Sequence, residues 1–234
     1  MNKDEFIEYC NNNLINISES KINKIIRFKE LLIEWNDKFN LTTITKEEDI
    51  FLKHFLDSIF LCKAVNLDNK KVCDFGTGAG FPGIVLSIIF DSSNYTLIES
   101  NSKKVTFLKY VKDTLNLTNV EIINERTEDY GKKNREIFDI VTCRAVSSLK
   151  VILELSISLT KINGLFIPMK ANIEEELQSL KDFPNKIGYK LEKTIEYELP
   201  IEKSKRTLLI YKKFKKTESI YPRNYSTIKK QSKM

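Results

Sequence analysis

The sequence is poor in the residues that bind metals or cross-link a chain. It contains one histidine and four cysteines among 234 residues, and no two cysteines form a Cys-x-x-Cys pair. A metal site held by the protein is therefore not expected. Cysteines scattered through apolar or helical runs are typical of reduced thiols, which favours a cytoplasmic protein over a disulfide-bonded secreted one.

Long apolar segments are missing as well. No stretch of about 18 consecutive apolar residues occurs, so no segment is predicted to span a membrane. Residues 1–5 also lack the apolar core of a signal peptide. With 41% hydrophobic and 30% charged residues, the composition indicates a globular protein. We expect it to be cytoplasmic, without membrane association, and monomeric.

Glycine is scarce, yet four of the seven glycines lie between residues 76 and 83. Residues 74–83 read Asp-Phe-Gly-Thr-Gly-Ala-Gly-Phe-Pro-Gly, between an apolar run at 71–75 and a helix-like run at 83–89. This order predicts a strand, a turn and a helix that has Pro82 just inside its start. In such a turn, Gly76, Gly78 and Gly80 let backbone N–H groups approach a ligand, and the helix N-terminus adds a positive dipole. The turn is therefore predicted to bind a nucleotide-like ligand.

Two carboxylates narrow the choice of ligand. Asp74 precedes the first glycine by two residues, where it would repel a pyrophosphate but suits a ligand that carries an ammonium and a sulfonium. Glu99 follows the next predicted strand, where a carboxylate can accept hydrogen bonds from both ribose hydroxyls. The alternative for Glu99 is a solvated acid at a strand end. The pattern Asp-x-Gly-x-Gly-x-Gly resembles motif I of the Rossmann-like S-adenosylmethionine methyltransferases, and this resemblance implies that cofactor.

The pattern of apolar residues changes near residue 65. Residues 1–65 show helical spacing, interrupted at 36–40 by a predicted connection, whereas strands and helices alternate after residue 70. The predicted strands are 71–75, 94–98, 120–124, 137–143, 164–169, 191–199 and 206–214, and the predicted helices are 82–90, 101–115, 148–160 and 172–183, with Gly164 as a stop signal.

Repeated β-α units predict a mostly parallel sheet with helices on both faces. The last two strands are separated only by residues 200–205, which is too short for a crossover helix and favours an antiparallel pair. We therefore expect an α/β fold, the Rossmann-like class I methyltransferase fold with a seven-stranded sheet. The expected organisation is a helical N-terminal extension at 1–65, a methyltransferase domain at 66–216 and a basic C-terminal tail at 217–234.

Positive charge is concentrated at the end of the chain. The net charge is +6, but residues 203–234 contain eleven lysines and arginines and one acidic residue. Such clustering is the pattern expected for contacts with a nucleic-acid backbone. On charge alone, a lysine-rich tail that serves solubility is an equally good interpretation.

Longer segments make the resemblance specific. Residues 74–83, with Phe-Pro-Gly fused to the glycine turn, resemble the family of bacterial ribosomal small subunit methyltransferase G, also called glucose-inhibited division protein B. The other matching segments, in order, are Trp35-Asn36, Asn40-Leu41-Thr42, His54, Asp57-Ser58, Glu99-Ser100, Lys103-Lys104, Phe107-Leu108, Arg126-Thr127-Glu128, Thr142-Cys143-Arg144-Ala145-Val146, Lys170 and Tyr221-Pro222-Arg223. The resemblance covers about residues 30–225.

The resemblance implies transfer of a methyl group from S-adenosylmethionine to N7 of one guanine in 16S ribosomal RNA, with the RNA or a small-subunit particle as partner. It also implies cofactor-binding roles for several positions. Together with the residues above, the predicted cofactor site is Asp74, Gly76, Gly78, Gly80, Phe81, Glu99, Thr127, Glu128 and Arg144. Thr127 stands where the family usually has alanine, and Cys143 where it has serine.

The N7 atom of guanine carries a lone pair and no proton, so the reaction needs no general base, and no catalytic residue is identified from sequence. Arg144 and Arg206 are the candidates; for Arg144 the alternative is a salt bridge that orients a loop. His54 is predicted to orient a helix end rather than to transfer a proton. The predicted RNA contacts are Arg126, Arg206, Arg223 and Lys213, while Tyr221 and Tyr225 either stack on bases or pack against the hairpin.

Two other functions remain open at this point. A small-molecule methyltransferase explains the glycine turn and Glu99 but not the basic C-terminal segment. A non-catalytic RNA-binding module explains that segment but not the intact cofactor motif.

Overall fold

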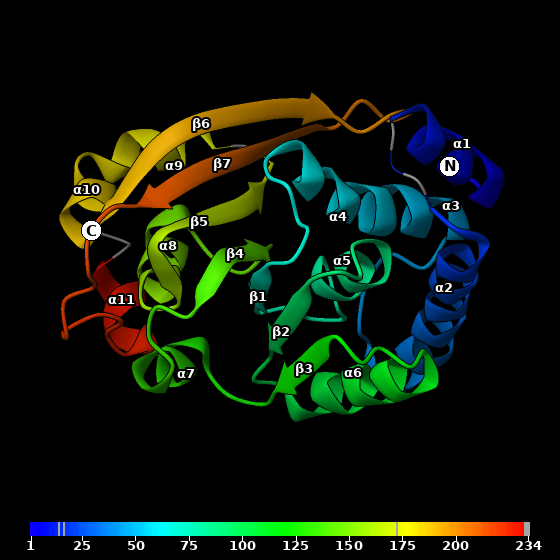
Figure 1. Cartoon of the computed structure of the whole chain (residues 1–234), viewed down its shortest axis with the longest axis horizontal. Helices are drawn as coiled ribbons and strands as arrows, with labels where there is room; N and C mark the ends of the chain where they lie inside the picture. Colours follow the sequence, from blue (N-terminus) through cyan, green and yellow to red (C-terminus); the bar gives the residue numbers. More distant parts are fainter. Residues whose placement is uncertain (14, 16, 172, 232–234) are drawn as a thin grey trace.

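A seven-stranded sheet forms the centre of the computed structural model, which describes residues 1–13, 15, 17–171 and 173–231 (Figure 1). The strand order is β3-β2-β1-β4-β5-β7-β6. Strands β1 to β5 pair in parallel, and β7 is antiparallel to both β5 and β6. This arrangement confirms the predicted Rossmann-like α/β fold. The strands are β1 (Lys71–Phe75), β2 (Asn94–Ile98), β3 (Val120–Ile123), β4 (Phe138–Arg144), β5 (Thr160–Lys170), β6 (Tyr189–Glu198) and β7 (Lys205–Lys213).

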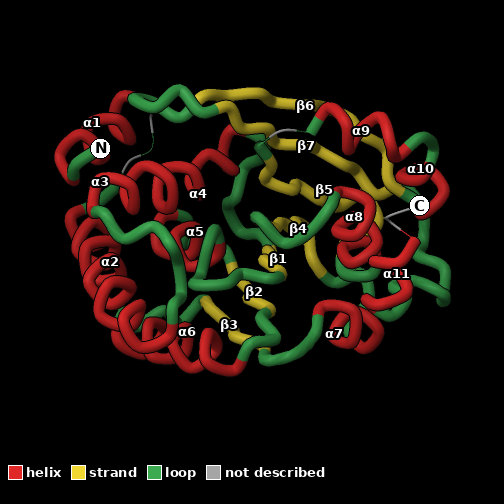
Figure 2. Tube along the Cα trace, turned by 180° about the vertical axis from the view of Figure 1, so that it is seen from behind, coloured by secondary structure: helices red, strands yellow, loops and turns green. Residues whose placement is uncertain are grey.

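Helices cover both faces of the sheet (Figures 1 and 2). One face packs in a common apolar cluster with α5 (Gly83–Ile89), α6 (Ser102–Thr114) and the N-terminal helices. The other face packs with α7 (Thr127–Lys133), α8 (Leu149–Ile157), α9 (Glu174–Leu180), α10 (Phe183–Ile187) and α11 (Tyr225–Gln231). The N-terminal segment contains α1 (Lys3–Asn12), α2 (Glu19–Phe39), α3 (Glu47–Asp49), the π-helix η1 (Ile50–Leu56), α4 (Asp57–Ile59) and the 3-10 helix η2 (Phe60–Lys63).

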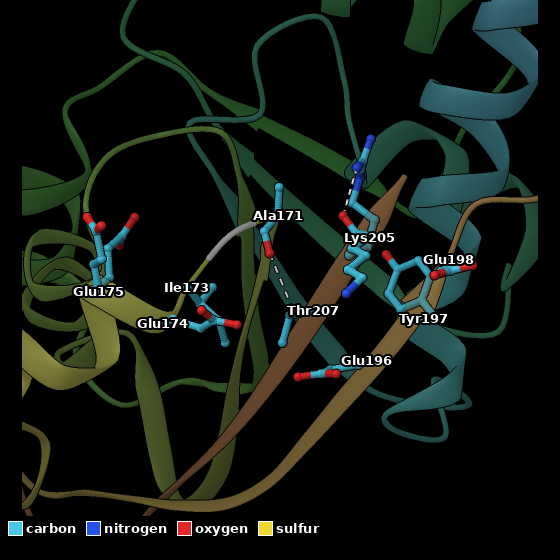
Figure 3. A pocket seen from close by; sticks show the side chains of 11 residues that line it. Ala171, Ile173, Glu174, Glu175, Glu196, Tyr197, Glu198, Lys205 and Thr207 are labelled. Carbon is cyan, nitrogen blue, oxygen red and sulfur yellow. Dashed lines mark hydrogen bonds between the residues drawn. The ribbon is translucent and has the colours of Figure 1, made fainter. Parts of the chain in front are cut away.

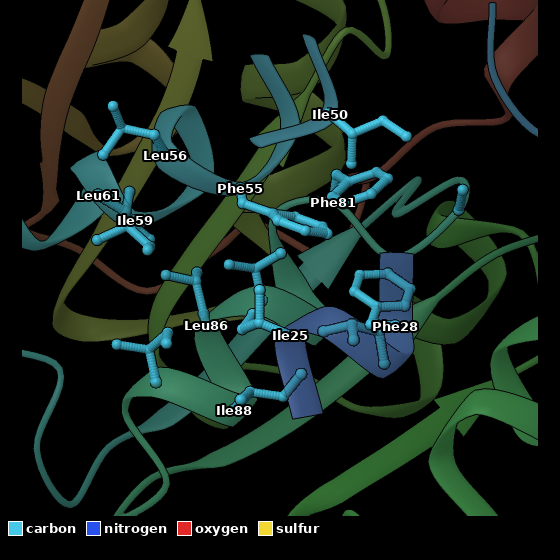
Figure 4. Close-up of a cluster of buried hydrophobic side chains, with 14 of the residues drawn as sticks. Ile25, Phe28, Ile50, Phe55, Leu56, Ile59, Leu61, Phe81, Leu86 and Ile88 are labelled. Atoms are coloured by element: carbon cyan, nitrogen blue, oxygen red, sulfur yellow. The ribbon is translucent and has the colours of Figure 1, made fainter. Parts of the chain in front are cut away.

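The N-terminal helices share their core with the sheet domain. Figure 4 shows Ile25 and Phe28 of α2 and Phe55 of η1 gathered with Leu86 of α5 and Phe81 of the glycine turn. Each of these side chains is at most 6% exposed. Burying a large apolar side chain stabilises the fold by roughly 1.5–3 kcal/mol. The N-terminal segment is therefore held against the glycine turn by a continuous apolar contact.

Several predicted boundaries were wrong. Residues 36–40 do not form a connection, because α2 continues to Phe39 and ends at Asn40 in the left-handed conformation. Gly164 does not end α8, since it lies inside β5. The predicted helix 172–183 is divided into α9 and α10 at Lys181, which has a φ of 47°. Residue 172 of that helix and residues 232–234 of the predicted tail lie outside the described residues.

Lys213 corrects a prediction about RNA binding. Its side chain is fully buried at the end of β7, so it cannot contact RNA. The ammonium donates hydrogen bonds to the Glu136 carboxylate at 2.7 Å and to the Ile157 and Thr160 carbonyls at 2.7 and 2.8 Å. It also donates to the Thr217 hydroxyl at 2.5 Å. Burial lowers the pKa of Lys213 from its ordinary value, and the Glu136 partner opposes this change.

We expect Lys213→Ala to lower the free energy of unfolding by about 3 kcal/mol, because it removes a buried charged donor that the Glu136 carboxylate and the Ile157 and Thr160 carbonyls share, even though Thr217 still donates to Glu136 and Ile157. The neighbouring Lys212 supplies a matched control, since its side chain is 42% exposed and its nearest carboxylate lies 3.7 Å away. Lys212→Ala should change stability by less than about 0.5 kcal/mol. Urea unfolding of both variants tests this, and equal losses would contradict the assigned role of Lys213.

Candidate functional site

The glycine turn lies between β1 and α5 and has a backbone that only glycine adopts easily. Gly76, Gly78 and Gly80 have φ values of 66°, 62° and 97°. A methyl group on Gly76 would lie 2.7 Å from a Val146 side-chain carbon, whereas a methyl group on Gly78 would meet nothing closer than 4.0 Å, the distance to both the Gly76 carbonyl oxygen and Lys104 Nζ. Pro82 follows a cis peptide bond and precedes α5, so it caps the helix from outside rather than lying just inside it. The turn is thus open on the side of Gly78.

Asp74 organises the turn from within the sheet. It is completely buried, and its Oδ2 atom accepts hydrogen bonds from the Gly83 N–H at 2.8 Å and the Thr77 hydroxyl at 2.7 Å. Gly83 is required here, because a Cβ atom would lie 2.2 Å from Leu97 and 2.8 Å from Asp74 Oδ2. The other oxygen, Oδ1, has no partner within the described residues. Burial raises the pKa of Asp74 to about 7, while its two donors act in the opposite direction.

Glu99 lies beside the open edge of the turn. Its Oε2 atom accepts from the Gly78 N–H at 3.0 Å and Oε1 from the Asn101 N–H at 2.8 Å. A carboxylate offers about four acceptor positions, so Glu99 retains capacity for further donors such as hydroxyl groups. The carboxylate is therefore fixed in place before any ligand binds.

A cavity of about 180 Å³ connects these groups. It is lined by predicted cofactor residues from three loops, namely Gly76, Glu99, Thr127 and Glu128, and by predicted RNA contact Arg126. Ile98, Val146 and Leu155 supply apolar surface, and Tyr225 of α11 completes the lining. The fold thus brings together the glycine turn, the end of β2 and the start of α7. An apolar wall beside two carboxylates suits a nucleoside.

Phe81 and Arg144 meet at the other end of the turn. The Phe81 ring stacks on His54, with centroids 4.1 Å apart and planes at 9°, and the Arg144 guanidinium lies 5.3 Å from the Phe81 centroid. Arg144 donates to His54 Nδ1 at 3.0 Å and to the Lys53 carbonyl at 2.9 Å. Because arginine only donates, His54 carries its proton on Nε2, which faces the Thr42 hydroxyl at 3.0 Å. Burial and the charge of Arg144 lower the pKa of His54 to about 3.

Asp57 connects Arg144 to the antiparallel hairpin. Its Oδ2 atom accepts from Arg144 at 2.9 Å and its Oδ1 atom accepts from the Tyr197 hydroxyl at 2.9 Å. The Arg206 Nε atom lies 3.7 Å from Oδ1. Asp57 is 5% exposed and Arg144 is 14% exposed, so this pair is shielded from solvent. The salt-bridge alternative for Arg144 is thus present, and His54 orients the arginine rather than a helix end.

A cavity of about 780 Å³ is lined in part by Arg206 and Tyr197, and Figure 3 shows it from close by. Its lining comes from the end of β5, the start of α9 and the hairpin strands β6 and β7. The lining residues are Ala171, Ile173, Glu174, Glu175, Glu176, Glu196, Tyr197, Glu198, Lys205, Arg206 and Thr207. The cavity has two cationic side chains and five carboxylates, and it lies at the edge of the sheet that carries the ends of the parallel strands.

Sequence reasoning named Gly76, Glu99, Arg126, Thr127 and Glu128 of the smaller cavity and Arg206 of the larger one, but it missed residues that contact the predicted side chains. Asp57 was noted only as part of a segment that resembles the family, and Tyr197 gave no signal, because each acts through contacts distant in sequence. Tyr225 packs near α8 rather than against the hairpin. Arg223 does not join the site: its Nε and Nη2 atoms donate to Glu154 at 2.7 and 2.5 Å, and Glu154 is buried. Arg223 is therefore a structural residue.

No group of histidine, cysteine and acidic side chains that could hold a metal occurs within the part of the chain that the structure describes. Over the same residues, no helix is long and apolar enough to cross a membrane.

Asp74 and His54 give opposite pH dependences of stability. Below about pH 7 the folded chain protonates Asp74 while the unfolded chain does not, so stability rises as the pH falls. Below about pH 6.5 the unfolded chain protonates its histidine while the folded chain does not, so stability falls.

We expect the free energy of unfolding of Asp74→Asn to fall by about 1.4 kcal/mol as the pH is lowered from about 7.5 to 5.5. In this variant the pH dependence of stability over this range comes from His54, because Asp74 no longer titrates. His54→Gln should show the opposite slope, a rise of about 1–2 kcal/mol over the same range. The wild type should lie between them. Urea unfolding at several pH values measures the slopes, and three identical slopes would contradict these assignments.

The strand order, the antiparallel hairpin and a glycine turn flanked by Asp74 and Glu99 define a Rossmann-like class I methyltransferase. The comparisons with known proteins agree. The family model described as rRNA small subunit methyltransferase G matches residues 21–209. The chain belongs to this family.

Relatives match over nearly the whole length. The chain is 44% identical over 229 residues to ribosomal RNA small subunit methyltransferase G of Mycoplasma capricolum, covering 97% of each chain. It is 38% identical over 231 residues to the protein of the same name from Bacillus subtilis, again covering 97% of each.

Solved structures share the fold at low identity. M. jannaschii TYW2 in complex with AdoMet aligns with a TM-score of 0.54 and 19% identity, over 68% of this chain and 77% of that one. A SAM-dependent O-methyltransferase from Thermotoga maritima aligns with a TM-score of 0.54 and 14% identity, over 80% and 73%.

Proposed function

We propose that this protein transfers a methyl group from S-adenosylmethionine to N7 of a guanine in 16S ribosomal RNA. The observation that carries the proposal is the glycine turn flanked by Asp74 and Glu99, beside a cavity that Gly76 and Glu99 line. Arg206 lines a second, larger cavity, and contacts from Arg206 to Asp57, from Asp57 to Arg144 and from Arg144 to Phe81 lead back to the turn. The family match and the names of the relatives support an RNA substrate of the small ribosomal subunit. The enzyme is proposed to act in the cytoplasm as a monomer.

The residues at the glycine turn fit the cofactor. The unpartnered Oδ1 atom of buried Asp74 suits the cationic amino-acid end, and Glu99 suits the ribose hydroxyls. A Cβ atom on Gly78 would have no neighbour closer than 4.0 Å, so a ligand can approach the backbone there once the flexible Lys104 side chain gives way. Thr127 and Glu128 lie at the start of α7, beside the apolar part of the cavity, where they would contact the adenine. Bound S-adenosylmethionine supplies an electrophilic methyl group on its sulfonium.

The protein's part in this chemistry is positioning. The N7 lone pair attacks without loss of a proton, so neutral His54 is not needed as a base. When N7, the methyl carbon and the sulfur are held in line and water is excluded, positioning of this kind can lower the activation barrier by on the order of 7–11 kcal/mol in favourable cases. Arg144 is fixed by Asp57 and His54 at the carboxyl end of β4, with its guanidinium over the Phe81 ring of the glycine turn, and we propose that it helps to align the reactants there.

We propose the large cavity as the site of the target nucleotide. Arg206 and Lys205 can contact phosphate, and nearby carboxylates such as Glu196 and Glu198 can accept from the N1–H and amino groups of guanine. Carboxylates also suit the positive charge that N7 methylation places on the base. Of the other predicted RNA contacts, Arg126 is half-exposed beside the smaller cavity and remains available.

Arg144→Ala should lower methyl transfer at least about a hundredfold, because a misplaced reactant loses most of the advantage of alignment. The melting temperature should also fall, since Asp57 and His54 lose a buried partner, while circular dichroism at low temperature stays native. Arg206→Ala should instead raise the KM for the RNA substrate. Lys190→Ala, an exposed change on β6, is the control. Normal turnover by Arg144→Ala would remove this residue from the site.

The function itself is tested by methyl transfer from tritiated S-adenosylmethionine to small-subunit particles and their RNA, isolated from cells that lack this gene. Borohydride–aniline cleavage then locates N7-methylguanine, with Glu99→Ala as an inactive control. One new cleavage site establishes the proposal. Labelled RNA without cleavage would exclude N7, and cofactor binding without any labelled RNA would favour a small-molecule substrate.

A further inference from the structure

The C-terminal segment contributes to the cofactor cavity. Of the residues that line the 180 Å³ cavity, Tyr225 alone comes from the last part of the described chain. The others come from the end of β2, from the loops after β1, β2, β3 and β4, and from α7 and α8. Tyr225 is the first residue of α11, which lies against α8 and beside α7 (Figures 1 and 2). The segment with the strongest excess of positive charge therefore passes beside this cavity.

Buried polar contacts hold the segment before α11 in place. The Arg135 guanidinium donates to the carbonyls of Thr217, Glu218 and Tyr221 at 2.7–3.2 Å. Arg223 donates through its backbone N–H and its guanidinium to Glu154 of α8, which has no exposed surface. These contacts fix the backbone on the N-terminal side of Tyr225.

Side-chain contacts on α11 and just before it complete the anchoring. Lys132 of α7 donates to the Asn224 amide oxygen at 2.9 Å, and Ile228 is 2% exposed in the apolar cluster of α8. The backbone of Tyr225 is therefore fixed from both sides, which limits the entropy lost when its side chain meets a ligand.

The Tyr225 ring is itself positioned beside the cavity. The Arg126 guanidinium lies 5.0 Å from the ring centroid, and Arg126 Nε lies 3.6 Å from the Glu128 carboxylate. Glu128, Arg126 and Tyr225 thus form a chain of contacts along the rim of the cavity. A cation over an aromatic ring stabilises the ring's orientation. Aromatic rings next to apolar surface are well suited to stack on a purine.

We propose that Tyr225 forms a wall of the adenine end of the S-adenosylmethionine site, so that residues 217–231 act in cofactor binding. This inference rests on the proposed cofactor. It assigns to the basic C-terminal segment a role other than RNA contact: Arg223 anchors the segment, and Tyr225 meets the ligand.

Isothermal titration of S-adenosylhomocysteine tests the proposal directly. Tyr225→Ala should raise the Kd about tenfold, and Tyr225→Phe should leave it within about twofold, because stacking needs the ring and not the hydroxyl. Tyr110→Ala is a matched control, since Tyr110 is an exposed tyrosine that stacks on Trp35 and does not line the cavity. The Kd of Tyr225→Ala for adenosine should exceed that of the wild type by the same factor.

A Kd for Tyr225→Ala within twofold of the wild type would overturn the proposal. If Tyr225→Ala weakens S-adenosylhomocysteine but leaves adenosine unchanged, the ring does not meet the adenine and the proposal is also wrong. Failure of the wild type to bind S-adenosylhomocysteine would instead refute the proposed cofactor. The melting temperature without ligand shows whether Tyr225→Ala is folded, and Arg126→Ala offers a second, independent change, expected to weaken binding because the ring loses its support.

Discussion

The buried carboxylate of Asp57 is the charge on which the arrangement of the site depends. It comes from the N-terminal helices, yet it accepts hydrogen bonds from Arg144 at the end of β4 and from Tyr197 on β6. Removing such a carboxylate from water is costly unless its partners converge on it. The N-terminal segment, the parallel strands and the antiparallel hairpin are therefore held in the relative position in which this charge is compensated, and in that position Arg144 and Arg206 both lie at Asp57.

A second buried carboxylate, Asp74, is compensated only in part. Two donors meet its Oδ2 atom, while Oδ1 has no partner among the described residues, and burial raises its pKa to about 7. Asp57 and Asp74 thus differ in the way expected of a structural group and a binding group. The first has its partners supplied by the fold, and the second has an oxygen without a partner among the described residues, as the proposed role in cofactor binding requires.

The distribution of positive charge is less simple than the sequence indicates. Lys213 is buried and donates hydrogen bonds to Glu136 and to backbone carbonyls, and Arg223 forms an ion pair with buried Glu154. Arg206 remains at a cavity, where it can meet a phosphate. The number of charges along a chain predicts attraction to a nucleic-acid backbone, but burial decides which of the lysines and arginines can contact it.

The sequence by itself determined the glycine turn, the positions of Asp74 and Glu99, and the β-α order, because these features depend on neighbours a few residues apart and on strand-to-helix periodicity. It did not indicate α7, which is seven residues long and lacks an apolar repeat. Only the tertiary structure decided that Asp57 meets Arg144 and Tyr197, 87 and 140 residues away, and that Lys213 is buried. Such contacts follow from the packing of whole elements, since a polar side chain gives no local sign of the distant partner that will compensate it.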